Sequence, residues 1–296
     1  MIVTNDFVSG LLTSFEALFE QKRSEAPVQW NRVAREVDAN DRKTVQFFGL
    51  GQAPTMRTFQ GKYEVGEAFT HDYSVTPTRR GVIVEIEKDS LRYNPLSEVT
   101  AFVANLSEQA MFYYDQQIFA QMGGAFVSLS FDGVSFYNAS HTFGNSAAFD
   151  NLSTAVLNSD GVEYNVLWAA INTAQGDHGV PMGYVPTDLV VHSNNRLTAR
   201  KLLNSTVIGT DTNVNQNDVK LVQTPRLPTT TEWHLVAKGS DAPFLLVVDI
   251  EPTYSDQQSD DSDAVFNSEV VRFKIACKCA TANGDPRRAA ASDGTV

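Results

Sequence analysis

The sequence predicts a protein of the α+β class, and three patterns carry this prediction. Between residues 95 and 122, apolar side chains recur at steps of three and four, which is the period of one face of a long helix. Residues 44–86 and 265–280 show the short or alternating apolar runs of β-strands. Between these segments, helix-like and strand-like patterns alternate over residues 126–249, which indicates a mixed sheet with flanking helices.

The first expected element is an amphipathic helix near the N-terminus that ends at Ala26-Pro27. Its apolar side chains are Phe7, Val8, Leu11, Leu12, Phe15, Leu18 and Phe19. A helix of about 15 residues is marginally stable alone in water, so this face needs a partner surface. The partner is either the same subunit or a neighbouring one. Because charged residues follow the apolar face, the segment does not have the pattern of a signal peptide.

Residues 44–86 are predicted to form a long two-stranded excursion. Glycine and proline interrupt short strand-like runs, of which Val82-Ile83-Val84-Glu85-Ile86 is the clearest. An isolated two-stranded hairpin is marginally stable, so the excursion also needs a surface to lie on, which a neighbouring subunit can supply.

The long helix is expected to begin at Pro95 and to end at Gly123-Gly124. Its apolar stripe contains Leu96, Val99, Val103, Leu106, Ala110 and Tyr113, widened by Phe102, Ile118 and Met122. A helix of this length is a rod of roughly 40 Å. It is either an ordinary core helix or a spine on which the rest of the chain is built.

The elements after the long helix alternate in type. We expect helices within 160–176 and 193–203, strands near 188–192, 219–223, 234–237 and 244–249, an acidic loop at 256–263 and a long strand at 265–280. The segment from Asn283 onward, rich in Gly and Ala, is predicted to be flexible.

Composition excludes several classes of protein. With 35 acidic and 23 basic residues, the net charge is −12, which argues against a dedicated nucleic-acid-binding surface. No apolar run reaches the length of a membrane span. Cys277 and Cys279 are one residue apart on a predicted strand, a spacing that favours reduced, buried thiols over a disulfide.

A search for catalytic and metal-binding patterns assigns no residue. The chain has no nucleophile elbow, no phosphate-binding loop with lysine and no paired-histidine zinc motif. Residues 211–215 resemble the start of a calcium loop, but Gln216 replaces the required glycine. The acidic loop is either a cation site or a solvated loop. A hydrolase remains an alternative only if His141, Asp177 and His178 converge in a pocket. We therefore predict no catalytic, cofactor-binding or metal-binding residue, and no cofactor.

In this order of elements, the chain resembles the Mu-like phage major head subunit family. The first part of the likeness lies in Met1-Ile2-Val3-Thr4, Leu11, Thr13, Ser14, Phe19, Ala26-Pro27, Gln29-Trp30-Asn31 and Val33-Ala34. It continues in Gly49 to Pro54, Gly61-Lys62, His71, Tyr73-Ser74, Asp89, Asp132-Gly133, Phe136, His141, Pro186-Thr187, Val190-Val191 and Leu202-Leu203-Asn204. The likeness spans roughly residues 1 to 280.

The resemblance implies the tailed-phage major capsid protein fold, which encapsulins share. Its parts are an N-terminal arm (1–43), an extended β-hairpin loop (44–86), a peripheral domain with the spine helix and the return strand (87–130 and 264–282), an axial domain (131–263) and a C-terminal tail (283–296). It implies a structural, non-enzymatic subunit of the icosahedral shell around a phage's double-stranded DNA. An encapsulin-like compartment is the alternative within the fold.

The resemblance also implies partners and a location. We expect other copies in pentamers and hexamers, a portal, a separate scaffolding protein and a possible decoration protein, with no membrane. Assembly is expected in the host cytoplasm and the product in the virion. Packaged DNA is expected to be contacted weakly, by a neutral or acidic inner surface. Arg32, Arg35, Arg79 and Arg80 are predicted to meet carboxylates across subunit contacts.

Overall fold

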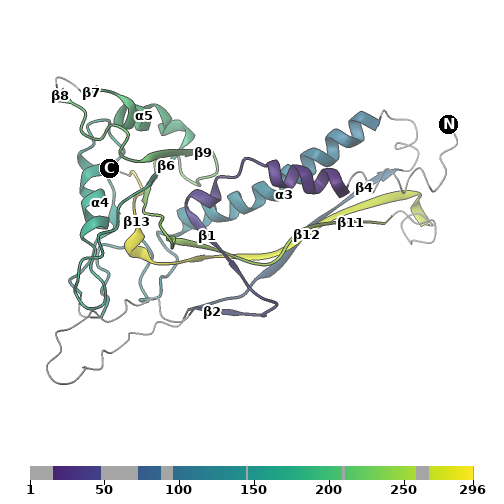
Figure 1. The fold of residues 1–296 in the computed structure, drawn as a ribbon, viewed down its shortest axis with the longest axis horizontal. Coiled ribbons are helices and arrows are strands. Elements are labelled where there is room, and N and C mark those ends of the chain that lie inside the picture. The colour runs from purple at the N-terminus through teal and green to yellow at the C-terminus, as the bar shows by residue number, and fades with distance from the viewer. Residues whose placement is uncertain are drawn as a thin grey trace.

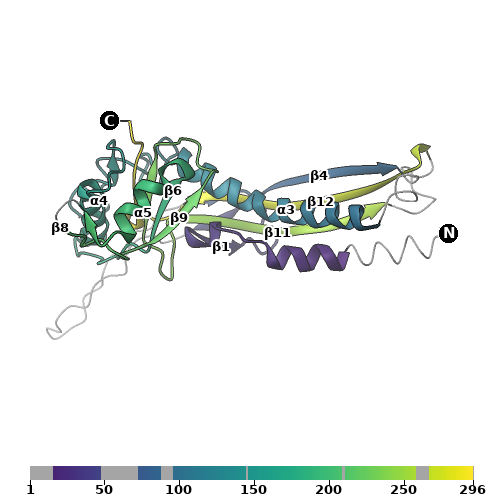
Figure 2. The same ribbon diagram turned by 90° about the horizontal axis from the view of Figure 1, so that it is seen from above.

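The computed structural model describes residues 16–47, 73–87, 96–144, 146–208, 211–257 and 267–295, with side chains of the long helix described from Thr100. The first 15 residues of the predicted arm, residues 48–72 of the predicted loop and most of the acidic loop lie outside the described residues. Figures 1 and 2 show an elongated molecule with a long sheet and a long helix at one end and a second, smaller sheet at the other.

The long sheet has the strand order β1-β11-β12-β4. Its members are β1 (Ala34–Asp38), β11 (Phe244–Gln257), β12 (Val270–Asn283) and β4 (Thr78–Glu87). β1 runs parallel to β11, and the other two pairs are antiparallel. The register between β11 and β12 shifts around Pro252. Proline has no N–H to donate to a neighbouring strand, so an irregular point of the ladder tolerates it best.

The helix α3 (Leu96–Gly124) lies along one face of the long sheet (Figure 1). Its 29 residues give a length of about 43 Å, and the 14 residues of β11 give about 46 Å. The two lengths match, so the helix can cover the long strands from end to end. The predicted spine helix and its C-terminal end at Gly123-Gly124 are confirmed, whereas Pro95 lies outside the described residues.

The buried face of α3 differs from the predicted stripe. Val103, Ile118 and Met122 are buried, but Leu106, Ala110 and Tyr113 are half-exposed. The polar residues Ser107 and Asp115 occupy fully buried positions instead. Ser107 can do so because its hydroxyl donates to the carbonyl of Val103 at 2.8 Å, which satisfies it within the helix. A prediction based on the spacing of apolar residues assigns polar positions such as Ser107 and Asp115 to the surface.

The mixed sheet has the order β5-β13-β10-β6-β9. Its strands are β5 (Leu152–Ser153), β13 (Ala289–Ser292), β10 (Trp233–Val236), β6 (Asp188–His192) and β9 (Lys220–Thr224). Two helices, α4 (Val162–Thr173) and α5 (Arg196–Asn204), pack on one face through a common apolar cluster. The predicted helices and strands of this region are confirmed.

Short elements complete the described chain. They are the 3₁₀ helices η1 (Trp30–Arg32), η2 (Ser193–Asn195) and η3 (Pro286–Arg288) and two ribbons, β2 (Val45–Phe47) with β3 (Tyr73–Val75) and β7 (Val207–Ile208) with β8 (Asp211–Thr212). The β2–β3 ribbon packs on the face of the long sheet opposite α3, where Leu245 and Val247 of β11 are buried. None of the described helices is both long and apolar enough to cross a membrane.

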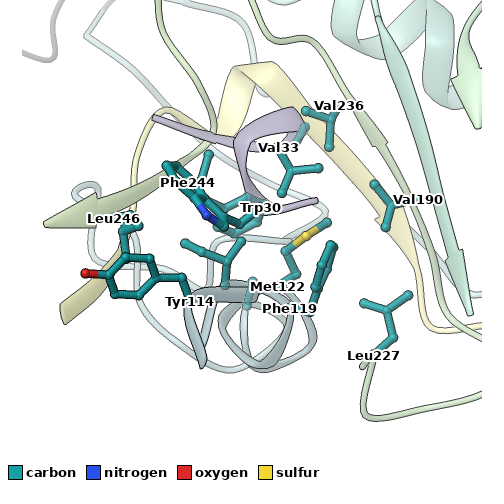
Figure 3. Packing of buried hydrophobic residues seen from close by; sticks show 14 of the residues in the cluster. Trp30, Val33, Tyr114, Phe119, Met122, Val190, Leu227, Val236, Phe244 and Leu246 are labelled. Carbon is teal, nitrogen blue, oxygen red and sulfur yellow. The ribbon is translucent and has the colours of Figure 1, made fainter. Parts of the chain in front are cut away.

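The two sheets meet at one apolar cluster around the C-terminal end of α3 (Figure 3). Phe119 and Met122 of α3 lie there with Trp30 from η1. Phe244 comes from the long sheet and Val236 from the mixed sheet. Because all of these side chains are buried in a single cluster, packing couples the two ends of the molecule.

The prediction of a flexible C-terminal tail is wrong. Ala289, Ala290, Ala291 and Ser292 form β13, and all four are fully buried within the mixed sheet. Alanine-rich sequence lacks the large apolar residues that mark a core strand. Here the small side chains fit between α4 on one face and the junction cluster on the other.

The buried His234 on β10 makes the stability of the protein dependent on pH. Its Nδ1 lies 3.0 Å from the hydroxyl oxygen of Tyr137, and burial lowers its pKa to about 3. Between pH 6.5 and 3, the unfolded chain therefore binds a proton that the native protein does not. The free energy of unfolding should fall by about 1.4 kcal/mol per pH unit as pH drops below 6.5. His234→Phe should lose this contribution, measured by denaturant unfolding at pH 5.0, 5.75 and 6.5.

Candidate assembly surfaces

Two of the three residues of the hydrolase alternative, His141 and Asp177, are buried in structural contacts, and His178 is half-buried. His141 is fully buried, with Nδ1 2.6 Å from Asp132 Oδ2 and Nε2 3.1 Å from the carbonyl oxygen of Phe136. Asp177 is also fully buried and lies 3.5 Å from the guanidinium of Arg287. Both ring nitrogens of His141 are thus occupied, and neither His141 nor Asp177 is open to a substrate.

The segment that resembles a calcium loop also has a structural role. The side-chain amide of Asn213 donates to the carbonyls of Leu202 at 2.6 Å and Ser205 at 2.8 Å. Its Oδ1 accepts the backbone N–H of Asn215 at 2.9 Å. Asn213 therefore holds the end of α5 to the following turn, and its amide oxygen is already used.

The described part of the N-terminal arm packs on its own subunit. Residues 16–25 form a helix beside α3 (Figure 2). Phe19 is fully buried, with its ring centroid 5.8 Å from that of Tyr254, and Leu18 packs against the cluster of Val103 and Phe273. Of the two hypotheses for the arm, the structure supports docking on the same subunit for these residues.

Asp115 ties the chain after this helix to α3. Its Oδ1 accepts the backbone N–H groups of Gln29 at 2.9 Å and Trp30 at 2.7 Å. Its Oδ2 lies 3.5 Å from the guanidinium of Arg226. One buried carboxylate therefore sets the position of η1, which delivers Trp30 to the junction cluster.

Within the described part of the chain, the strand β4 forms an edge of the long sheet. Val82 and Ile83 are 48% and 59% exposed, although both are residues that favour burial. Gly81 pairs with Ala276 of β12, and a Cβ built on it would lie 2.8 Å from the carbonyl oxygen of Ile275. The glycine allows this close approach. An open edge with apolar side chains is a surface on which another chain can add.

A groove of about 530 Å³ separates this edge from α3. Leu106, Ala110 and Tyr113 line it on the helix side. Val82 and Cys277 line it on the sheet side. Both cysteines are free and buried, as predicted. The half-exposed part of the predicted apolar stripe thus faces a groove, where it is available for contact with another chain.

Because Leu106 faces the groove, a charged residue at this position should destabilise the protein less than the predicted buried stripe implied. Leu106→Asp should lower the free energy of unfolding by only about 1 kcal/mol, because water reaches the side chain. Val103→Asp, four-fifths of a turn away on the buried face, should cost about 3 kcal/mol or more. Denaturant unfolding of the two variants measures the difference. Equal losses would show that both positions have the same environment.

Two arginines predicted to meet carboxylates of neighbouring subunits pair within the chain. Arg32 forms an ion pair with Asp188, and the Nε of Arg35 lies 3.2 Å from Asp241 Oδ1. Asp188 and Asp241 are far from these arginines in sequence, so spacing alone could not reveal the pairs. Arg32 and Arg35 thus have carboxylate partners within their own subunit, and their pairing across subunit contacts stays a prediction.

The long helix against a long sheet, joined to a compact mixed sheet, is the fold of tailed-phage capsid proteins. A chain of the procapsid of bacteriophage JBD30 has this fold, with a TM-score of 0.60 and 18% identity over 98% of this chain and 76% of that chain. A chain of the virus-like particle from Pyrococcus furiosus aligns with a TM-score of 0.54 and 8% identity, over 95% of this chain and 98% of that one. The predicted fold class is confirmed.

The sequence comparisons add the family. Residues 72–292 match the family of phage capsid proteins, and the chain belongs to that family. The major capsid protein of Escherichia phage Mu is 26% identical over 141 residues, which are 48% of this chain and 46% of the Mu protein. The match therefore spans about half the length of this relative. The predicted Mu-like resemblance is confirmed.

Proposed function

We propose that this chain is the major capsid subunit of a tailed phage, and that its copies form the icosahedral shell around double-stranded DNA. The observation that carries the proposal is the family match over residues 72–292, which covers α3 and nearly all of both sheets. The JBD30 procapsid chain supports it, because nearly the whole of this chain aligns with its fold. The role is structural, with no catalytic step and no cofactor.

The division into domains follows the sheets. The peripheral domain consists of α3 and the long sheet. This sheet takes in β1 of the predicted arm, β4 of the predicted extended loop and β11 of the predicted axial domain. The axial domain consists of the mixed sheet with α4 and α5, and it gains β13 from the predicted tail. The β2–β3 ribbon forms the base of the extended loop.

The proposed partners are other copies of the chain in pentamers and hexamers, a portal and a separate scaffolding protein. A decoration protein is also proposed, because a JBD30 capsid with a related fold carries minor capsid protein trimers. That structure aligns with a TM-score of 0.58. Assembly takes place in the host cytoplasm, and the shell belongs to the virion.

Electron microscopy of the purified, expressed protein tests the proposal. Closed shells, or rings with five- and six-fold symmetry, are the expected result. A small shell filled with an enzyme cargo would support the encapsulin-like compartment instead. A monodisperse monomer at high concentration, with or without scaffolding protein, would contradict both.

Empty shells should bind duplex DNA weakly at physiological salt. The chain carries 35 acidic and 23 basic residues. A strongly basic inner surface of the shell would therefore require most of the Lys and Arg side chains to face the interior. Raising the salt concentration from 50 to 500 mM should weaken assembly modestly, since exposed ion pairs contribute only about 0 to 1 kcal/mol each. Electrophoretic mobility shift with purified shells measures DNA binding. A steep salt dependence, indicating several phosphate contacts per subunit, would contradict the prediction.

A further inference from the structure

The mixed sheet ends at β9, which pairs with β6 on one side. Among the described residues, no strand pairs with β9 on its other side. The backbone N–H of Lys220 donates at 2.9 Å to the carbonyl of Thr187, next to β6. Because backbone groups alternate in direction along a strand, those of Leu221 and Gln223 point to the open side. This edge therefore offers donors and acceptors to which an extended chain can add.

A groove of about 630 Å³, here called the β9 groove, lies along this edge beside α5 (Figure 2). Its charged lining residues are Arg196 and Arg200 of α5 and Lys220 of β9. The remaining lining residues are uncharged: Gln29, Asn204, Asn217, Val219, Leu221 and Gln223. All three cations are exposed, and none of them forms a salt bridge within the described part of the chain. A chain with a net charge of −12 thus gathers three cations in a groove that no acidic residue lines.

The pocket next to the β9 groove shows the more usual arrangement of charges. It shares Lys220 with the groove and is also lined by two cations, Arg32 and Lys238, and two carboxylates, Asp188 and Asp218. Arg32 forms an ion pair with Asp188, and the Nζ of Lys238 donates to the carbonyl of Ala34 at 2.9 Å. The two cations of this pocket therefore have partners within the chain, whereas the three cations of the β9 groove lack a carboxylate.

The cations of the β9 groove lie on both faces of the sheet edge. Val219 and Leu221 pack into the apolar cluster beneath α5, so the side chain of Lys220 points to the opposite face. Arg196 and Arg200 are four residues apart, a rise of about 6 Å along α5. Residues on the same face of a strand are about 6.7 Å apart. An extended segment beside β9 can thus place carboxylates against cations on both of its faces.

We propose that the β9 edge binds an acidic, extended peptide segment of another protein, which adds to the sheet as a strand and places its carboxylates against Arg196, Arg200 and Lys220. Backbone hydrogen bonds supply affinity in this mode of binding, and the side chains along the edge supply selectivity. The inference goes beyond the proposed function and does not depend on it.

The edge suits a peptide better than a nucleic acid. Its outward carbonyls accept peptide N–H groups, whereas a phosphate backbone has no such donor and is repelled by these oxygens. The β9 groove also has only three cations, and the net charge of −12 opposes the approach of a duplex.

Fluorescence anisotropy with the full-length protein tests the proposal. The probe is a labelled peptide of sequence TDDTDDTD, in which threonine favours an extended chain and aspartates fall on both faces. In the control peptide, asparagine replaces every aspartate. The acidic peptide should bind at least about tenfold more tightly than the control peptide, and its affinity should fall as the salt concentration rises.

Two variants separate the charges from the strand edge. R196E/R200E should weaken binding of the acidic peptide at least about tenfold, because attraction becomes repulsion. Gln223→Pro removes the outward N–H of an exposed residue, a change that an edge strand tolerates. It should weaken binding at least about threefold, as expected for one lost hydrogen bond. Gln223→Ala keeps the N–H and should bind as the wild-type protein does.

Controls identify misfolding and general effects of charge. Lys201→Glu removes a cation of α5 that does not line the β9 groove, so binding should change less than about threefold. Thermal unfolding of every variant shows whether the fold is intact. Failure of the acidic peptide to bind at 1 mM, equal binding of both peptides, or wild-type affinity in a folded Gln223→Pro variant would overturn the proposal.

Duplex DNA is the competing ligand. If a short duplex binds, R196E/R200E abolishes that binding and the acidic peptide does not bind, the β9 groove is a nucleic-acid site and the proposal fails. Shell formation is measured separately by electron microscopy, so either result leaves the proposed function to its own test.

Discussion

Ala290→Asp is expected to abolish the folded protein. Ala290 is fully buried in β13, paired with Leu235 and packed in the cluster that contains Tyr164 and Leu167. An aspartate there would place a charge without partner or water between the sheet and α4. The expected loss exceeds about 4 kcal/mol, a large share of the stability of a typical domain. Soluble yield and circular dichroism measure the effect.

Thr295→Asp is the matched control for this variant. It introduces the same charge five residues later in the chain, at an exposed position. It should leave the soluble yield and the unfolding midpoint within about 0.5 kcal/mol of the wild-type protein. Normal yield and a normal midpoint for Ala290→Asp would show that β13 is not part of the sheet and that the C-terminal segment is flexible after all.

Asp115→Ala is expected to lower the free energy of unfolding by about 3 to 5 kcal/mol. The substitution leaves two buried N–H groups, of Gln29 and Trp30, without their acceptor. It also removes the carboxylate next to Arg226. Removal of one member of a buried, hydrogen-bonded charged pair leaves its partners buried without a hydrogen-bond acceptor or counter-charge. The resulting loss of stability is larger than the net stability that the intact pair contributes. Denaturant unfolding measures the loss.

Gln116→Ala, the next residue on α3, controls for the change in helix sequence. Gln116 is exposed, and glutamine and alanine differ little in helix propensity, so the effect should stay within about 0.5 kcal/mol. Limited proteolysis adds a second measurement: Asp115→Ala should become sensitive to cleavage between residues 25 and 34, whereas Gln116→Ala should not. A stable Asp115→Ala variant would contradict the role of this carboxylate in positioning η1.

Periodic elements were predictable because their signals are local. Apolar spacing, Pro95 and the pair Gly123-Gly124 placed α3, and alternation placed β12. The predicted ranges 160–176 and 193–203 located α4 and α5 to within a few residues. The family likeness was also visible in sequence order. None of these inferences requires knowing which elements touch.

The differences arose where a residue's environment depends on distant parts of the chain. Asp115 is polar in sequence, but backbone groups 85 and 86 residues away make its burial possible. Leu106 lies on an apolar stripe, yet the sheet beneath it leaves a groove. Arg32 and Arg35 find carboxylates more than 150 residues later in the chain. Nothing near these residues in sequence indicates such partners.

The sequence by itself determined the class of the fold, the order of its elements and the phage capsid family, since periodicity and family motifs are properties of the linear chain. Only the tertiary structure decided which face of α3 is buried and that the C-terminal segment is a central strand. The physical reason is that burial and charge pairing are set by contacts between elements, and strand order brings together residues that the sequence separates.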